Sequence, residues 1–410
     1  GECTHIPQAV NAASEATACA STRSKIAAFP TLEAHGLLWV WPDDSPTSWI
    51  DSAAASPVVG KVTDPNTFWL ALDYPVSHAT LLENTFDPAH VNYLHNGKVA
   101  VGVGGAYLHP EGARIIHDFR QVGETTANGG FFLTHSTMYK SAWDYNTTLD
   151  FCPPCLNIMT FLDQDGTIKN LEMHYVPMRP GLTRIMFSST IVGGPPEGWK
   201  PKKESIAEKV SKTVKMAGFV IGQLPKLLLP MYVRVGLFHL GDALSNQDII
   251  AGHTEDRQAA GNGGSWRSQY HLPTPSNVGV LALRNWVDRY AGGGPTWFGD
   301  TNEREIVLNN SPSDLFNRWE RHSKWCPSCR KSLKWFGKVE VVASTVAAAF
   351  FGLGLVLAAI RTASPRLALA AVVAGAAALL ARFQVQKLRM AFISAIPSTG
   401  IPEYSHEWPN

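Results

Sequence analysis

The chain has 410 residues, which is enough for one large domain with an extension or for two domains. Its 35 basic and 34 acidic residues give a formal net charge of +1, so no global field favours nucleic acid or an acidic substrate. Hydrophobic residues make up 45% of the chain, with 13 Trp and 18 Phe, which excludes an intrinsically disordered protein.

The N-terminal part carries no visible targeting segment. Gly1 stands first, and no charged start followed by an apolar run opens the chain, so we expect the sequence to be part of a longer protein. Residues 1–60 are rich in Ala, Ser and Pro. The apolar run at 36–41 predicts a buried strand that Pro42 closes.

A series of short strands dominates the pattern from about residue 70 to residue 192. Gly, Asp and Pro turns separate them, and strands joined by short turns indicate an antiparallel sheet. The clearest predicted strands cover residues 113–122, 130–138, 156–162, 171–178 and 183–192.

Helical patterns follow the strands. We expect a polar helix at 202–215, an apolar segment at 219–240 that Pro225 and Pro230 interrupt, and a mixed helix around 244–255. Residues 275–292 predict one more helix, and the glycines at 292–294 end it.

The C-terminal region predicts a transmembrane hairpin. Residues 341–360 contain no charge and are long enough to cross a bilayer as a helix, and residues 367–381 add a shorter apolar segment after a charged turn. A buried helical pair in a soluble domain is the alternative, although such a domain seldom offers this much uninterrupted Ala, Val and Leu.

Basic residues around the two spans predict the topology of the hairpin. They outnumber those in the loop, so the main domain and the C-terminal tail should lie on the same side of the bilayer. The flanking residues are Lys331, Lys334 and Lys338 before the first span and Arg382, Lys387 and Arg389 after the second, while Arg361 and Arg366 lie between.

A cluster of polar residues between 83 and 97 is the first candidate site. Asp87 suits a helix N-cap, Pro88 suits the first helical position, and Asn96 with Gly97 suits a stop. His90 and His95 would not share one face of an ideal helix, so both could bind one metal only near a distorted helix end. Taken alone, such a pair is more often part of a surface or a core.

Asp248 supplies a third candidate ligand, because an acidic residue is costly on an otherwise apolar helix. Two imidazoles and one carboxylate on one side of iron form the facial triad of non-haem iron oxygenases. The alternative is a solvated carboxylate next to Gln247.

These motifs resemble the catalytic domain of Rieske-type non-haem iron oxygenases, and the likeness extends over nearly the whole chain. Asp87, His90, His95 and the pair Gln247-Asp248 carry it. Further segments are similar to the pheophorbide a oxygenase branch of that family: residues 1–9, 36–42, Glu83 with Asn84, 273–276, 286–290 before the glycines, the pair Cys326 and Cys329, and the C-terminal hairpin.

The resemblance implies an α+β fold, a helix-grip antiparallel β-sheet flanked by helices, with the hairpin appended. It implies that His90, His95 and Asp248 bind a mononuclear Fe(II) and that Asn84 lies nearby. It further implies that Asp87 accepts a hydrogen bond from a ligand histidine and couples it to the Rieske 2Fe-2S cluster of a neighbouring subunit, in a homotrimer.

The resemblance also implies an activity. Dioxygen activated at Fe(II) would be inserted into a chlorin, with ring opening of pheophorbide a in chlorophyll breakdown as the leading reaction and ferredoxin as the electron source. The protein would lie in a chloroplast membrane, inner envelope or thylakoid, with its catalytic domain on the stromal side. Alternatives are a chlorophyllide, protochlorophyllide-linked or sterol oxygenase, or a non-catalytic membrane-tethered tetrapyrrole- or lipid-binding module that holds no iron.

The chain departs from the family in one respect. A Rieske cluster needs paired Cys-x-His and Cys-x-x-His loops, and that pair of motifs does not occur in these residues. We therefore expect a catalytic part that binds iron without turning over. Its expected divisions are 1–60, the segment after a missing Rieske domain; 61–325, the catalytic domain; 326–340, a CxxC linker; 341–381, the hairpin; and 382–410, the tail.

Six cysteines, including two CxxC pairs, do not fit a secreted disulfide framework and favour a reducing compartment. Cys326 and Cys329 have the spacing of a redox dithiol, and the resemblance implies a thioredoxin-responsive switch there. Inert thiols, or a zinc site built from both CxxC pairs, are alternatives. No role is assigned to Cys152 and Cys155.

Overall fold

The computed structural model describes most of the chain, and its elements confirm the α+β class with a C-terminal helical hairpin. The predicted helical segments at 202–215 and 219–240, and the predicted stop at Asn96 and Gly97, lie outside the described residues. Those residues are 1–34, 37–54, 69–95, 99–100, 105–106, 115–139, 142–163, 166–193, 244–297, 302–308, 315–360 and 364–394.

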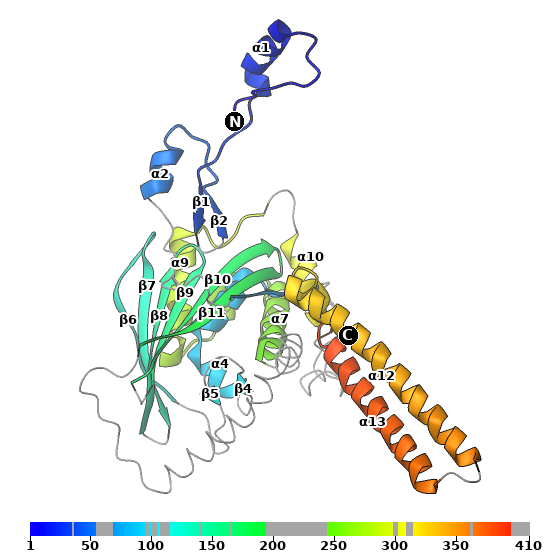
Figure 1. The fold of residues 1–410 in the computed structure, drawn as a ribbon. Coiled ribbons are helices and arrows are strands. Elements are labelled where there is room, and N and C mark those ends of the chain that lie inside the picture. Colours follow the sequence, from blue (N-terminus) through cyan, green and yellow to red (C-terminus); the bar gives the residue numbers. More distant parts are fainter. Residues whose placement is uncertain are drawn as a thin grey trace.

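A seven-stranded antiparallel sheet forms the centre of the protein (Figure 1). From β6 to β11 each strand pairs with the next in sequence, and β3 joins the edge by pairing with β11. All five strands named from the sequence are present, and β8 is a further one. The bounds are β3 Leu70–Tyr74, β6 Ile115–Thr126, β7 Gly130–Tyr139, β8 Ala142–Cys152, β9 Leu156–Asp163, β10 Ile168–Arg179 and β11 Leu182–Gly193.

Two helices, α3 (His78–Phe86) and α9 (Val278–Tyr290), pack against one face of this sheet, and α7 (Leu244–Asn262) packs against α3. Their apolar side chains form one core with the inward residues of the strands. Phe86 packs against Phe131 and Phe151, with ring centroids 5.1 and 5.9 Å apart. Trp286 packs against Phe151 from α9. The core therefore fixes α3, the helix that leads into the candidate site, against the sheet.

Short elements connect these layers. In the N-terminal part they are α1 (Ala12–Ala20), η1 (Thr22–Ser24), β1 (Thr31–Ala34), β2 (Leu37–Val40) and α2 (Ser48–Ala54). Further along are α4 (Pro88–Tyr93), β4 (Val99–Ala100), β5 (Gly105–Ala106), α8 (Trp266–Gln269), η2 (Pro275–Asn277), α10 (Glu303–Leu308) and η3 (Trp319–Ser323).

One predicted strand has the wrong burial. The strand expected at 36–41 exists as β2, but it is not buried, because Leu38 is 71% exposed. Among the strands that the structure describes it pairs with β1 alone, and one of its faces lies near the main sheet, where the rings of Trp39 and His174 are 6.0 Å apart. A two-stranded ribbon covered on one side cannot bury both faces.

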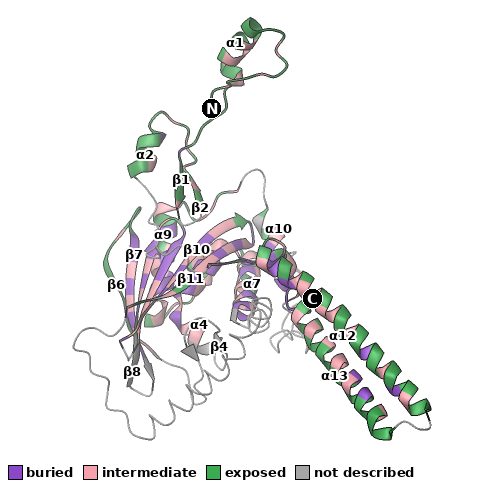
Figure 2. Ribbon diagram, viewed as in Figure 1, coloured by how far each residue is buried: buried purple, intermediate pink, exposed green. Residues whose placement is uncertain are grey.

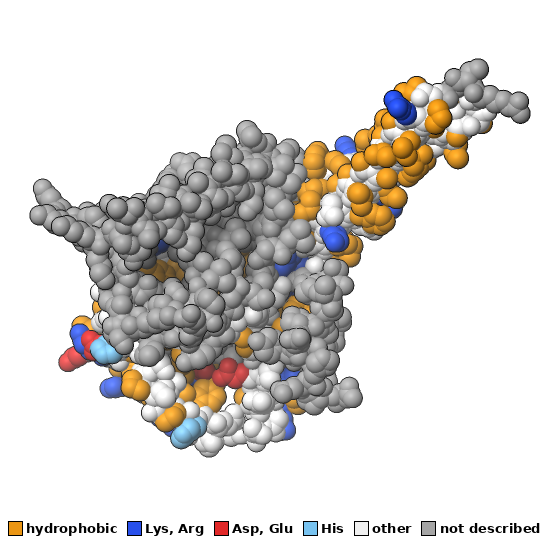
Figure 3. All heavy atoms as spheres, turned by 90° about the horizontal axis from the view of Figure 1, so that it is seen from below, with side chains coloured by type: hydrophobic (Ala, Val, Ile, Leu, Met, Phe, Trp, Pro, Cys, Tyr) orange, Lys and Arg blue, Asp and Glu red, His pale blue; other side chains and the backbone are white. Residues whose placement is uncertain are grey.

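The C-terminal hairpin consists of α12 (Pro327–Ala359) and α13 (Pro365–Met390), both long and apolar enough to cross a membrane. Most of their surface is exposed (Figure 2), with Leu355 73% and Leu380 64% accessible. Figure 3 shows apolar side chains along this projection. The alternative of a buried helical pair in a soluble domain is therefore wrong.

Candidate metal centre

Two short helices position the first two predicted ligands. Asp87 ends α3 and begins α4, and its carboxylate accepts a hydrogen bond from the amide of Ala89 at 3.0 Å, with Pro88 in the first turn. The predicted cap is confirmed. Because α4 ends at Tyr93, His95 lies past the helix end. This is the departure from helical geometry that the spacing of His90 and His95 requires.

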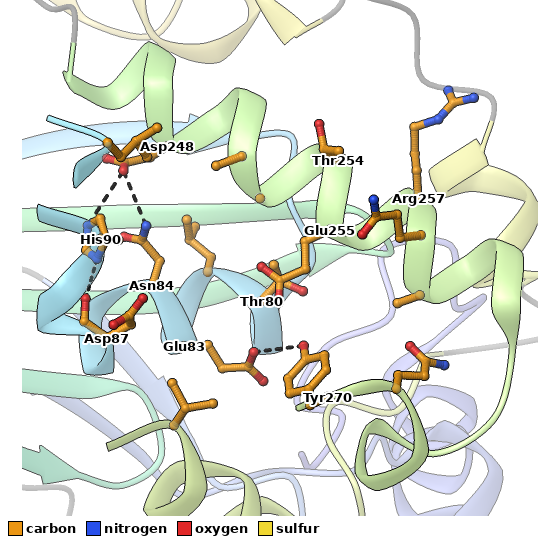
Figure 4. Close-up of a pocket in the computed structure, with 18 of the residues that line it drawn as sticks. Thr80, Glu83, Asn84, Asp87, His90, Asp248, Thr254, Glu255, Arg257 and Tyr270 are labelled. Carbon is orange, nitrogen blue, oxygen red and sulfur yellow. Dashed lines mark hydrogen bonds and ion pairs between the residues drawn. The ribbon is translucent and has the colours of Figure 1, made fainter. Parts of the chain in front are cut away.

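The third predicted ligand approaches from α7, and the three side chains meet (Figure 4). Asp248 Oδ1 lies 3.1 Å from His95 Nε2 and 3.8 Å from His90 Nε2. One ligand atom from each residue lies within 4.8 Å of the others. Residues 153 positions apart in the sequence thus present two nitrogens and one oxygen to a common point.

Both imidazole rings are oriented through their other nitrogen. Nδ1 of His90 is hydrogen-bonded to the main-chain carbonyl of Asp87, and Nδ1 of His95 lies 3.1 Å from Gln247 Oε1. A protonated Nδ1 that donates to an oxygen leaves Nε2 unprotonated toward the common point, as in metal-binding histidines. The sequence indicated no such role for Gln247. The carbonyl, rather than the carboxylate, of Asp87 contacts His90.

The charge at the centre favours a cation. Burial lowers the pKa of His95, but its hydrogen bonds with Asp248 and Gln247 outweigh that effect and raise the pKa above its ordinary value. Asn84, on α3, donates to Asp248 Oδ1 at 3.2 Å. It thereby holds the carboxylate oxygen that faces both rings.

A cavity of about 1040 Å³ opens from this centre, with His90 and Asp248 in its wall. Apolar side chains such as Leu81 and Val280 line part of it. The end away from His90 and Asp248 is polar, because Tyr270 donates to Glu83 Oε2 at 2.9 Å and Glu255 lies beside it (Figure 4). Burial raises the pKa of Glu255.

The two CxxC pairs lie apart. Cys326 and Cys329 form a second group of metal-ligating side chains with His322, and the described residues contain no group that joins them to Cys152 and Cys155. The latter pair occupies the turn between β8 and β9. A single zinc site from both pairs is therefore wrong. His322 was missed from the sequence, although the spacing His-x3-Cys-x2-Cys is visible there.

The chain resembles several chloroplast proteins and matches no protein-family model. It is 25% identical to pheophorbide a oxygenase of Oryza sativa subsp. japonica, over 85% of this chain and 62% of the relative. The chain is a distant relative of pheophorbide a oxygenase. The likeness to flavonoid 8-hydroxylase 2 of Ocimum basilicum is 22% identity over 93% of this chain and 68% of that protein.

The chain spans about three fifths of the pheophorbide a oxygenase that it matches. Among solved structures, dicamba monooxygenase bound to 3,6-dichlorosalicylic acid is 14% identical, with 70% of this chain and 75% of that chain covered and a TM-score of 0.42.

Proposed function

We propose that this chain is the catalytic part of a Rieske-type oxygenase in which His90, His95 and Asp248 bind one ferrous iron. The observation that carries the proposal is the convergence of the three ligand atoms, with both Nδ1 atoms engaged elsewhere. Homology to pheophorbide a oxygenase supports it independently.

The residues present fit ferrous iron. Two neutral imidazoles and one carboxylate are the donor set of non-haem iron oxygenases, which leave coordination positions open. His90 and Asp248 lie in the cavity wall, so open positions would face a bound substrate. Iron bound here would supply reductive activation of dioxygen for insertion into that substrate.

The remaining residues of the centre orient the ligands. Asn84 fixes the oxygen of Asp248, Gln247 fixes the ring of His95, and the carbonyl of Asp87 fixes the ring of His90. We further propose that Asp87 faces the electron donor, a Rieske 2Fe-2S cluster of a neighbouring subunit in a homotrimer, which ferredoxin reduces.

The substrate that we propose is a chlorin, with pheophorbide a first. A cavity of about 1040 Å³ is slightly larger than the ~300–1,000 Å³ of most small-molecule sites, which suits a macrocycle. The names of the relatives include pheophorbide a oxygenase, chlorophyllide a oxygenase and flavonoid 8-hydroxylase 2, so other tetrapyrroles and smaller ring systems are the rivals.

The same proposal places the protein at a chloroplast membrane. Chloroplastic relatives support the organelle, and the exposed apolar hairpin of α12 and α13 supports insertion into a bilayer, with the sheet on the stromal side. We propose that Cys326 and Cys329, at the start of α12, lie on that side of the membrane.

Iron content tests the proposal. The purified chain, loaded anaerobically with ferrous iron and desalted, should retain about one iron per chain by mass spectrometry, as a three-ligand site predicts. Each of the changes His95→Ala and Asp248→Ala should remove it. His117→Ala, on the exposed side of β6, is the matched control and should retain it. A non-catalytic binding module would hold no stoichiometric iron, and that result would overturn the proposal.

A further inference from the structure

A second cluster of ligand side chains lies where the sheet meets the hairpin. His322 Nε2 lies 3.2 Å from Cys329 Sγ, and ligand atoms of His322, Cys326 and Cys329 all lie within 4.8 Å of one another. The cluster is enclosed, because His322 and Cys329 are buried and Cys326 is only partly exposed. It shares no residue with the candidate iron centre.

An unusual turn of backbone builds this cluster. Residues Trp319–Ser323 form a π-helix, in which the amide of Lys324 donates to the carbonyl of Trp319 at 3.1 Å. Such turns are rare and are frequently found at functional sites. The turn buries His322, and the chain then restarts as α12 with Cys326 as its N-cap, whose sulfur accepts from the amide of Cys329.

The imidazole of His322 is held in the way that metal-binding histidines are held. Its Nδ1 lies 2.6 Å from the carbonyl of Ala71 on β3, which fixes the ring and directs Nε2 at the sulfurs. His90 in the iron centre is held by a main-chain carbonyl in the same way. The orienting contact comes from an element some 250 positions earlier in the sequence.

Three ligand atoms lie close to one another, and the ring that carries one of them is fixed by a main-chain carbonyl. This geometry suits a cation, and it is an observation independent of the CxxC spacing that suggested a dithiol.

We propose that His322, Cys326 and Cys329 bind a thiophilic divalent cation such as Zn²⁺. Sulfur and imidazole ligands are those that zinc prefers, and three protein ligands leave the fourth tetrahedral position for water. The two nitrogens and one oxygen of the other centre are harder ligands and suit ferrous iron. The two sites thus select different metals by ligand type.

A cation at this position joins three parts of the fold. His322 connects it to β3 through Ala71, and the cysteines belong to the start of α12. The segment that follows α13 is tied to the same turn, because the amide of Trp319 donates to the carbonyl of Ile393 at 3.0 Å. The bound metal fixes the base of the hairpin against the sheet.

Cobalt binding is the direct test. The full 410-residue chain, purified in detergent with a reductant and freed of metal, is titrated with Co²⁺, and the thiolate-to-cobalt charge-transfer band is followed in the near ultraviolet. The unaltered chain should show this band and lose it to added Zn²⁺. The changes Cys326→Ser and Cys329→Ser should weaken or abolish the band, and His322→Gln should reduce the affinity for cobalt at least tenfold.

The other CxxC pair provides the matched control. Cys152→Ser with Cys155→Ser also removes two thiols three positions apart, but no third ligand accompanies them, so the band should persist. His95→Ala should likewise leave it unchanged.

Two results would overturn the proposal. One is the absence of a charge-transfer band in the reduced, unaltered chain. The other is an equal band after His322→Gln. A disulfide between Cys326 and Cys329 in protein alkylated directly in the lysate, combined with no band after reduction, would favour the redox dithiol instead.

Discussion

The two imidazoles of the candidate iron centre are held by different kinds of partner. A main-chain carbonyl orients His90, and no side-chain substitution removes it. A side chain, Gln247, orients His95. Only the contact between Gln247 and His95 can be removed by a side-chain mutation. That mutation therefore measures how much the orientation of the His95 ring contributes to the affinity for metal.

Replacing Gln247 by Leu should weaken iron binding about 10–100-fold, the usual cost of losing a partner that orients a metal ligand. Nδ1 of His95 would lose its acceptor, and the proton could move to Nε2, where the metal binds. Competition with a calibrated chelator measures the affinity. Gln258→Leu, an exposed position on the same helix, should bind iron as the unaltered chain does; equal affinities for both variants would argue against the orienting role.

Local chemistry made part of this centre predictable. The cap at Asp87 follows from residue preferences at helix starts, and the ligands follow from the likeness to a known motif. Gln247 was missed because its role depends on His95, 152 positions away in the sequence, whereas His322 was missed although Cys326 and Cys329 follow it closely. Nothing near His322 in the chain indicates that the carbonyl of Ala71 fixes its ring.

At the scale of elements, alternation of apolar and polar residues predicted most strands but missed β8. On its buried face Thr147 stands beside Leu149 and Phe151, and polar residues such as Asp150 occupy the other face. Because a polar residue stands among the buried ones, the alternation of apolar and polar residues is hard to detect in the sequence. In the folded protein, pairing with β7 and β9 stabilises the strand. The prediction that β2 is buried was wrong for a different reason. The strand is apolar, but its sequence does not show which elements pack against it.

The contact between α9 and α3 depends on a glycine. A Cβ added at Gly279 would lie 2.2 Å from the carbonyl oxygen of Phe86, which directly precedes Asp87. Gly279→Ala should therefore push α3 away and destabilise the fold by about 1–3 kcal/mol, as overpacking does. The displacement should also weaken iron binding. Thermal unfolding and chelator competition measure the two effects.

Gly261, in α7, is the matched control, because an added Cβ there meets nothing within 4 Å. Gly261→Ala should be neutral or stabilising by up to about 1 kcal/mol, since alanine is the better helix former. If both variants unfolded at the same temperature as the unaltered chain, the close packing of α9 against Phe86 would be refuted.

The hairpin is the other element whose geometry leads to a prediction. Gly354 and Gly375 lie against Val372 and Phe351 of the facing helix, a close approach that small residues allow. At its base Glu340 pairs with Arg389 at 2.9 Å. Arg382 also lies 3.8 Å from Glu340, so charged residues gather at the base of the hairpin, and Arg366 lies at its other end.

Protease digestion of sealed membranes should therefore cut a C-terminal tag and the catalytic domain together. Basic residues are in excess at the base of the hairpin, and such Lys- and Arg-rich flanks stay on the side of the membrane from which the helices insert. The catalytic domain and the C-terminal tag both adjoin this base, so both should lie on that side. A loop tag placed between α12 and α13 should be protected in the same vesicles. Protection of the C-terminal tag while the catalytic domain is cut would contradict a two-span hairpin.

At the scale of the whole molecule, the described residues contain a candidate iron centre and a cavity, and the proposed oxygenase also needs a source of electrons. Cys3 and His5 have the spacing of one Rieske loop, yet the sequence contains no Cys-x-x-His to form the second. Sequence alone could indicate this, because cluster ligands follow fixed local spacings. It could not indicate the shape of the cavity, which α3, α4, α7 and α8 form together.

The 410-residue chain loaded with iron should consume no oxygen with reduced ferredoxin and pheophorbide a, whereas a longer chain that carries a Rieske domain should turn over. In that longer chain Asp87→Asn should lose most of its activity and keep its iron. Asparagine caps a helix as well as aspartate does, so the change removes the charge that faces the donor while α4 still begins at the same residue. Asp51→Asn, on the exposed helix α2, is the matched control and should turn over normally. An oxygen electrode and iron analysis of the same samples separate loss of electron delivery from loss of metal. Oxygen consumption by the 410-residue chain alone would mean that electrons reach the centre without a Rieske cluster, and the proposed role of Asp87 would then be wrong.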